Sequence, residues 1–392
     1  MLHRSIVDLP LHAGQCPRWL FDKMVRLSRA ILLVIYREFG KRELILRLSD
    51  PFWFQALGCL VGFDWHSSGL TTTLGAAVKK ALEPYYEDLG IFLCGGKGNS
   101  ALNTPKEIEF WAEKAALDNE ISKFISLSRL IAKIDNYALQ DGFHLYFHLF
   151  IFTKDKDWAV IQQGMDEKTL YARRYHWNYE ASKNFFSDPH KGILSVIKKE
   201  EVLNLVSSKS KQVRDAIINM LQEDLTKILR EVKVVEKIIF KSNHGLSYRD
   251  LPISILPKIW EKTYENPPQE FKDLLLIEGL GAKALRALTL TAELIYNVKA
   301  CRIDPVHYSF AHGGKDGHPY KINPFIYENT IAQLEELLRL APMEYSEKKK
   351  LWQRLLDFCK IKKKKYFKFF RKKRILKEII ITNLLYFLNI FS

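Results

Sequence analysis

Apolar residues recur at helical spacing along most of the chain. A first amphipathic helix is predicted over residues 17–39, with Gly40 as its C-terminal stop, and Asp50 is placed to cap the next helix. The exception is the segment 144–163, where two apolar runs rich in Phe, Ile and Val flank the polar residues 154–157. This pattern predicts a β-hairpin.

The loop of this hairpin determines which side chains face each other. If the loop consists of residues 154–157 alone, Thr153 pairs with Trp158 and His148 faces Gln163. Successive side chains point to opposite faces of a strand. The side chains predicted to share one face are His144, Tyr146, His148 and Gln163.

The two periodicities together predict an α+β fold with two domains and a tail. Residues 1–199 form an N-terminal α+β domain that contains the hairpin, and residues 200–340 form a mainly helical domain. Residues 341–392 form a basic C-terminal tail of low complexity. The last apolar run of the tail is about fourteen residues long, short of the roughly twenty that span a bilayer, so no membrane insertion is expected.

A glycine turn joins two helical patterns between residues 274 and 288. The turn is Gly279-Leu280-Gly281, and a second helix is predicted directly after it. This stretch resembles the helix-hairpin-helix element that binds DNA. Gly279 and Gly281 can adopt positive φ and bring backbone N–H groups close to a phosphate, and Lys283 can add its ammonium group. Such a site holds the sugar-phosphate backbone without reading sequence. The alternative is an ordinary αα-hairpin with a glycine turn.

Polar side chains lie within aromatic sequence at two places in the N-terminal half. Residues 63–69 contain Asp64 and His66, just before a threonine-rich helix start. In the segment 171–177, Arg173 and Arg174 are interleaved with tyrosine and tryptophan. This basic-aromatic pattern is suited to phosphate contact and base stacking, whereas a solvated helix face with aromatic packing is the alternative.

We expect these two segments and the hairpin to line one N-terminal cleft, because polar groups tolerated among aromatic residues need partners or a ligand. A further group of acids and histidines lies among glycines in the loop 302–319, where functional residues often collect. The candidate catalytic residues are Asp64, His66, His148, Gln163 and Asp304.

The formal net charge is +15, a value typical of nucleic-acid binding. The tail, however, holds 15 Lys and Arg against 4 Asp and Glu, which is +11, so the rest of the chain carries only +4. DNA binding by the body of the protein must therefore rest on local groups. Five scattered cysteines without C-x-x-C spacing disfavour a disulfide framework and a zinc cluster and suit a reducing cytoplasm. The N-terminus lacks a signal-peptide pattern.

Four segments carry a resemblance that extends over most of the chain. They are residues 50–73, 158–165, 171–177 and 308–319. With these segments the chain resembles the archaeal and bacterial family catalogued as domain of unknown function 763, from about Leu9 to about Pro342. The resemblance implies no established activity, and the tail lies outside it.

A more local similarity is to the helix-hairpin-helix base-excision glycosylases, in which a G-x-G-x-K turn is followed by an aspartate at the active site. Residues 279–283 match the turn, and Asp304 stands 21 residues beyond Lys283. The resemblance implies Lys283 as a Schiff-base amine and Asp304 as the carboxylate that supports the sugar cation. Pro305 departs from the residue that follows the aspartate in that superfamily.

The leading functional hypothesis is a DNA-binding protein that acts in DNA repair or processing through sequence-independent contact with the backbone. Three alternatives stay open: a base-excision glycosylase or lyase, a metal-dependent nuclease, and a non-catalytic DNA-binding scaffold. The nuclease is the alternative that implies a cofactor, a divalent metal ion. Its candidate ligands are Asp64, His66, Asp141, His144 and His148.

Overall fold

The computed structural model describes five main stretches of the chain, which are residues 16–63, 68–195, 197–239, 253–264 and 267–306. It also describes residues 332, 335–337, 339–341 and 344–353. The chain divides into two compact units, residues 1–327 and 328–392. All labelled helices and strands lie in the first unit.

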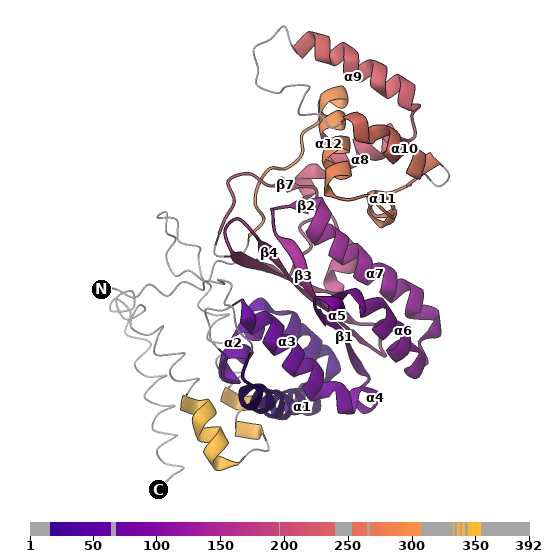
Figure 1. Cartoon of the computed structure of the whole chain (residues 1–392). Helices are drawn as coiled ribbons and strands as arrows, with labels where there is room; N and C mark the ends of the chain where they lie inside the picture. Colours follow the sequence, from indigo (N-terminus) through magenta and orange to yellow (C-terminus); the bar gives the residue numbers. More distant parts are fainter. Residues whose placement is uncertain are drawn as a thin grey trace, which may run out of the picture. The chain divides into compact units, whose positions relative to one another are not determined.

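The centre of the first unit is an antiparallel five-stranded sheet with the order β1-β3-β4-β5-β6 (Figure 1). Its strands are β1 (Ile91–Lys97), β3 (His144–Thr153), β4 (Trp158–Asp166), β5 (Tyr171–Asn178) and β6 (Gly192–Leu194). A separate two-stranded sheet pairs β2 (Leu139–Gln140) with β7 (Leu203–Asn204). The predicted α+β class and the predicted hairpin, β3–β4, are confirmed.

The predicted register of the hairpin is wrong by one residue. Phe152 pairs with Trp158, and His148 pairs with Gln162. The reason is the turn: Thr153 N donates to Asp157 O at 3.0 Å, which adds Thr153 to the loop. Because side chains alternate along a strand, this shift turns Gln163 onto the face opposite to His148.

Helices cover both faces of the sheet (Figure 1). Helices α1 (Arg18–Ser49), α2 (Pro51–Leu60) and α3 (Gly69–Leu82) pack on one face. Helices α6 (Thr104–Lys114) and α7 (Ile121–Lys133) pack on the other, and the short α4 (Tyr86–Leu89) and α5 (Asn99–Leu102) flank β1. Side chains from both faces of each central strand are therefore buried.

The ends of these helices agree with the predictions made from the sequence. The side chain of Asp50 accepts a hydrogen bond from Trp53 N at 2.8 Å, as expected of the cap of α2. Gly40, the predicted stop, has φ 81° and interrupts α1 before the helix resumes. The amphipathic character predicted for this helix is visible in α1, where Met24 and Ile31 are buried, although Trp19 is exposed.

A helical region follows the sheet along the chain. Its helices are α8 (Lys211–Leu221), α9 (Leu225–Ile239), α10 (Leu256–Tyr264), α11 (Phe271–Leu276) and α12 (Ala282–Tyr296). The segment after α12 returns to the sheet side, where Cys301 bridges to Asn204 of β7. The domain boundary predicted at residue 199 stays a prediction. Among the described helices, none is both long enough and apolar enough to cross a membrane.

The packing of α3 on the sheet leaves no room at Gly75. A Cβ atom on this residue would stand 2.6 Å from Cζ of Phe147. We expect Gly75→Val to lower the free energy of unfolding by about 1–3 kcal/mol in chemical denaturation, because the buried ring must shift. The control is Ala76→Val at the next position of the helix, which is exposed. Equal stability of the two variants would contradict the packing described here.

Candidate nucleic-acid interface

A five-residue turn, 277–281, joins α11 to α12. Gly279 has φ +74°, the left-handed conformation predicted for it. Gly281 does not share that conformation, since its φ of −119° and ψ of −168° are those of extended backbone. The expectation of positive φ at Gly281 is therefore wrong, because this residue is the N-cap of α12 and N-caps are commonly extended.

Side chains from elsewhere in the fold bond to two carbonyl groups of this turn and to that of the first residue of α12. Lys133 Nζ donates to Ile277 O at 3.0 Å, and Lys262 Nζ donates to Glu278 O at 2.8 Å. Gln140 Nε2 donates to Ala282 O at 2.8 Å. These three donors, from α7, α10 and β2, fix the turn and occupy acceptors that it would otherwise present to solvent.

The N–H groups of the same turn are in the opposite situation. Among the described residues, no acceptor is bonded to the backbone N–H of Gly279 or Gly281, or to those of residues 282–284 in the first turn of α12. Gly281 also has no side chain with which to cap the helix. The positive end of the α12 dipole thus meets a group of free N–H donors, which is the arrangement that binds anions.

Cationic side chains surround these donors. Lys283 in the first turn of α12 and Arg286 in the second are both exposed. Arg286 Nε donates to Gln140 Oε1 at 2.9 Å, so it lies beside the anchored turn. Partial burial, together with the nearby charge of Arg129, lowers the pKa of Lys133.

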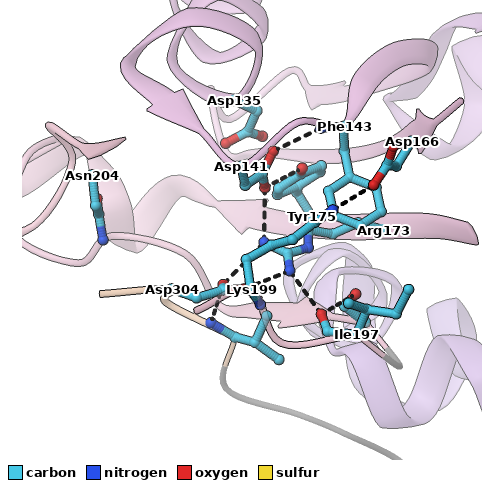
Figure 2. Close-up of polar contacts among 12 residues, drawn as sticks. Asp135, Asp141, Phe143, Asp166, Arg173, Tyr175, Ile197, Lys199, Asn204 and Asp304 are labelled. Carbon is cyan, nitrogen blue, oxygen red and sulfur yellow. Dashed lines mark hydrogen bonds and ion pairs between the residues drawn. The ribbon is translucent and has the colours of Figure 1, made fainter. Parts of the chain in front are cut away.

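Arg173 lies at the centre of a buried network between the sheet and the end of the helical region (Figure 2). Its guanidinium donates to Asp141 at 2.9 Å and to both carboxylate oxygens of Asp304, at 3.0 and 2.8 Å. A fourth hydrogen bond, of 2.9 Å, reaches Ile197 O. Burial would lower the pKa of Arg173, but the charges of Asp141 and Asp304 raise it. The predicted DNA contact by Arg173 is wrong, because the side chain is fully buried.

Asp304 is equally enclosed. Besides the two bonds from Arg173, its oxygens accept from Lys199 N at 2.7 Å and from Val306 N at 3.2 Å. A carboxylate has about four lone-pair positions, and these four donors occupy them. Its side chain is 0% exposed. The structure therefore gives Asp304 the role of an ion-pair partner and leaves no accessible carboxylate for a sugar cation.

Asp141 completes the network on the other side of Arg173. Its second contact is with Tyr175, whose hydroxyl donates to Oδ2 at 2.7 Å, and its other oxygen accepts from Phe143 N (Figure 2). Burial raises the pKa of Asp141 although Arg173 lowers it. Next to this network, the ammonium group of Lys199 bonds to Asp166. Burial would raise the pKa of Asp166, but the bond from Lys199 and one from the backbone of Lys168 lower it to about 2.

Arg174 faces the opposite side of the sheet and is also fully buried. Its guanidinium donates to Gln55 Oε1 at 2.7 Å and to Thr71 Oγ1 at 3.2 Å, and it lies 5.0 Å from the ring centre of Phe54. None of the described carboxylates pairs with it, and burial lowers its pKa to about 9. Its predicted role in DNA contact is wrong for the same reason as that of Arg173.

His148 and Gln163, the two candidate catalytic residues of the N-terminal half that the structure describes, lie on opposite faces of the sheet. Gln163 bonds to Thr71, to Tyr146 and, at 2.9 Å, to Ser68 O on the α3 side of the sheet. His148 lies on the α7 side, where Ser128 Oγ and Gln162 Oε1 are each 2.8 Å from one of its ring nitrogens. Burial lowers the pKa of His148. Asp64 and His66 lie outside the described residues, so their predicted roles stay predictions.

Asp135 forms a second buried network that the sequence pattern did not single out. It lies in a π-helical turn, Ile134–Ala138, a distortion of a kind often found at functional sites. Its carboxylate accepts from His190 Nε2 at 2.6 Å, from Trp177 Nε1 at 2.8 Å and from Gln162 Nε2 at 2.5 Å. Gln162 links this carboxylate to His148, and no periodicity in the sequence could have indicated that chain of contacts.

Metal binding gains no support from the described residues, in which no three His, Cys, Asp or Glu side chains gather in a geometry that could hold an ion. Of the five candidate ligands of a nuclease, Asp141 is paired with Arg173 and His148 is held by Ser128. Two further candidate ligands, Asp64 and His66, cannot be added to this picture, because residues 64–67 lie outside the described part.

Comparison with known proteins adds one family. A family model described as "Protein of unknown function (DUF763)" matches residues 5–322 of the chain. The match extends across the sheet, the helices on both of its faces and the turn between α11 and α12. No curated protein and no solved structure matches the chain.

The Arg173 network makes a prediction about stability. Arg173→Met would leave Asp141 and Asp304 buried without their counter-charge, and we expect it to lower the free energy of unfolding by about 3–5 kcal/mol at neutral pH. Arg174→Met is the matched control. It should lower the free energy of unfolding by less, because the buried cation that it removes has no acidic partner to leave behind. Urea denaturation of both variants measures the difference. A larger loss for Arg174→Met would contradict the assignment.

The pKa of Asp166 gives a prediction about pH. A carboxyl whose folded pKa is about 2, below its ordinary 3.8, stabilises the fold above pH 3.8, and that stabilisation is lost as the pH falls through 2. Lys199→Met should therefore lower the free energy of unfolding by at most about 2 kcal/mol at pH 7. The difference from wild type should shrink between pH 4 and 2. Lys198→Met, at the exposed neighbouring position, should show no such pH dependence; a constant difference for Lys199→Met would refute the ion pair.

Proposed function

The chain belongs to the DUF763 family, and we propose that it is a DNA-binding protein that holds the sugar-phosphate backbone on the turn between α11 and α12. The observation that carries this proposal is that side chains bond to carbonyl groups at this turn, whereas its backbone N–H groups stay free. The carbonyl groups of residues 277, 278 and 282 are occupied by Lys133, Lys262 and Gln140, while the N–H groups at 279 and 281–284 have no acceptor in the described part of the chain.

The free N–H groups favour a phosphate as the ligand of the turn for an electrostatic reason. The free N–H groups lie at the positive end of a fifteen-residue helix, α12, where a negative charge is stabilised. Lys133, Lys262 and Lys283 add three positive charges, and Glu278 is the one acid within the segment 277–283. Phosphate oxygens accept several hydrogen bonds at once, so a backbone phosphate satisfies donors that a neutral ligand would leave unpaired.

The proposed contact is independent of base sequence. Backbone N–H groups and lysine ammonium groups recognise phosphate and sugar, and they carry no information about base edges. Such binding suits a protein that acts wherever DNA needs repair or processing, and a helix-hairpin-helix element would supply this contact. The small net charge outside the tail, +4 of +15, agrees with a local contact rather than a broad basic surface.

The catalytic alternatives receive less support from the described residues. A lyase built on Lys283 and Asp304 would need an accessible carboxylate, whereas Asp304 is saturated by its four donors. A nuclease would depend on Asp64 and His66, which lie outside the described residues. Binding without catalysis, as in a scaffold, requires only the turn, and it is the simplest form of the proposal.

The proposal predicts a charge-reversal effect at the turn. Lys283→Glu should weaken binding to duplex DNA of any sequence by about tenfold or more at low salt, which corresponds to about 1.4 kcal/mol. It should also reduce the slope of log K against log salt by about 0.9, the value for one lost phosphate contact. Fluorescence anisotropy with two unrelated duplexes measures both quantities.

The control is Lys299→Glu, an exposed lysine just beyond the other end of α12. It makes the same change in net charge about 21 Å along the helix axis from the turn. Its affinity and salt slope should stay near those of wild type. Equal losses in the two variants would show that the net charge of the protein, and not the turn, governs binding.

A further inference from the structure

A cavity of about 360 Å³ lies between α8 and the start of α11, two helices that lie side by side (Figure 1). Residues Asn184 and Phe186 close it on a third side. The volume is within the range of small-molecule sites in proteins, about 300–1,000 Å³. Neither the turn nor the buried arginine network uses any of its lining residues.

Arg214 gives this cavity an oriented positive charge. Its guanidinium donates to three backbone carbonyls, Leu205 O at 2.8 Å, Ser207 O at 2.7 Å and Phe186 O at 2.9 Å. An arginine has five N–H groups, so two remain without an acceptor in the described part of the chain. The residue is 6% exposed, and none of the described carboxylates forms an ion pair with it. Burial lowers the pKa of Arg214 and the nearby charges of Asp215 and Asp188 raise it, so its guanidinium has acids in its surroundings but no direct ion pair with a described carboxylate.

Two lysines stand at the rim of the cavity. Lys211 pairs with Asp215 at 2.6 Å, and Lys272 pairs with Glu270 at 2.8 Å. All four side chains are solvent-exposed, and exposed pairs of this kind contribute little stability. Either lysine can therefore turn to an anionic ligand at small energetic cost. The lining as a whole carries three positive and two negative side chains.

The remaining lining groups suit a planar heterocycle. The rings of Phe186 and Phe271 meet edge to face with their centres 5.2 Å apart. Both line the cavity, as do the carboxamides of Asn184, Asn219 and Gln269. Aromatic rings stack on nucleobases of any kind, and carboxamides match the donors and acceptors on base edges. An anion with an attached base matches this mixture of cations, rings and carboxamides, although Asn184 Oδ1 already accepts from Phe186 N and Gln269 Nε2 donates to Pro267 O.

We infer that this cavity binds a single nucleotide unit of a nucleic-acid strand, with the phosphate at Arg214 and Lys211 and the base against Phe271. The inference rests on the proposed function, because the cavity is a second contact for the same strand whose backbone the turn binds. Helix α11 runs from Phe271 at the cavity to Leu276 at the turn, which is about 7.5 Å at 1.5 Å per residue. Two or three nucleotides cover that distance at about 3.4 Å of axis each.

The test uses the full-length protein and 2′-deoxyadenosine 5′-monophosphate in isothermal titration calorimetry at low salt. Wild type should bind it saturably, with a Kd below about 1 mM. Asn219→Trp, a change at an exposed position of the lining, should fill the cavity and weaken binding at least tenfold. Gln212→Trp, an exposed position of the same helix outside the lining, should bind as wild type does.

A second variant tests the charge. Arg214→Gln removes the cation and should also weaken binding at least tenfold; if it fails to fold by circular dichroism, Asn219→Trp alone carries the test. Absence of saturable binding by wild type would overturn the inference. Inorganic phosphate that binds as tightly as the nucleotide would show an adventitious ion only and would overturn it as well. Unchanged affinity in Asn219→Trp would place the ligand elsewhere.

The two proposals fail in different ways. If the turn binds duplex backbone and the cavity binds a nucleotide, Lys283→Glu weakens duplex binding without changing affinity for the mononucleotide. If only the cavity inference is wrong, the mononucleotide does not bind, but Lys283→Glu still weakens binding to duplex DNA. Failure of the proposed function would appear as duplex binding that does not respond to Lys283→Glu, whatever the mononucleotide does.

Discussion

The ion pairs of Arg173 with Asp141 and Asp304 are the constraint on which the rest of this structure depends. Arg173 and Asp304 are 131 residues apart in sequence, and both side chains are fully buried. Removing one member of a buried ion pair leaves an uncompensated charge, which is strongly unfavourable. The segment that follows α12 therefore has a fixed position against the sheet, while α12 itself ends at its C-cap, Asn297, which has the left-handed conformation common at helix C-termini.

The opposite end of α12 is fixed by a second set of contacts. Lys133, Gln140 and Lys262 bond to the carbonyl groups of residues 277, 282 and 278, so the turn is held from three elements. A helix anchored at both ends presents its first N–H groups in one arrangement, which lowers the entropic cost of ordering them on binding. The free donors of the turn are thus preorganised for an anion, and the nearby cavity at Arg214 offers a second contact along the same strand.

Local signals in the sequence predicted much of the fold. The α+β class, the β3–β4 hairpin, the Asp50 cap and the left-handed Gly279 each follow from a few adjacent residues. The register was missed because one hydrogen bond, from Thr153 N to Asp157 O, lengthened the loop. The two arginines were misread for a different reason. Their alternation with aromatic residues fits both a basic patch and a strand buried on both faces, and only contacts far along the chain, with residues 304 and 55, distinguish the two.

The most direct measurement is the response of the turn's own amide groups to DNA. In ¹⁵N-edited NMR spectra of the protein, a short duplex at low salt should shift the amide proton resonances of Gly279, Gly281, Ala282 and Lys283 downfield, as expected for new hydrogen bonds to phosphate. The shifts should saturate together and should be the same for unrelated sequences. If these four resonances stay in place while others move, DNA binds elsewhere, and the assignment of the turn is wrong.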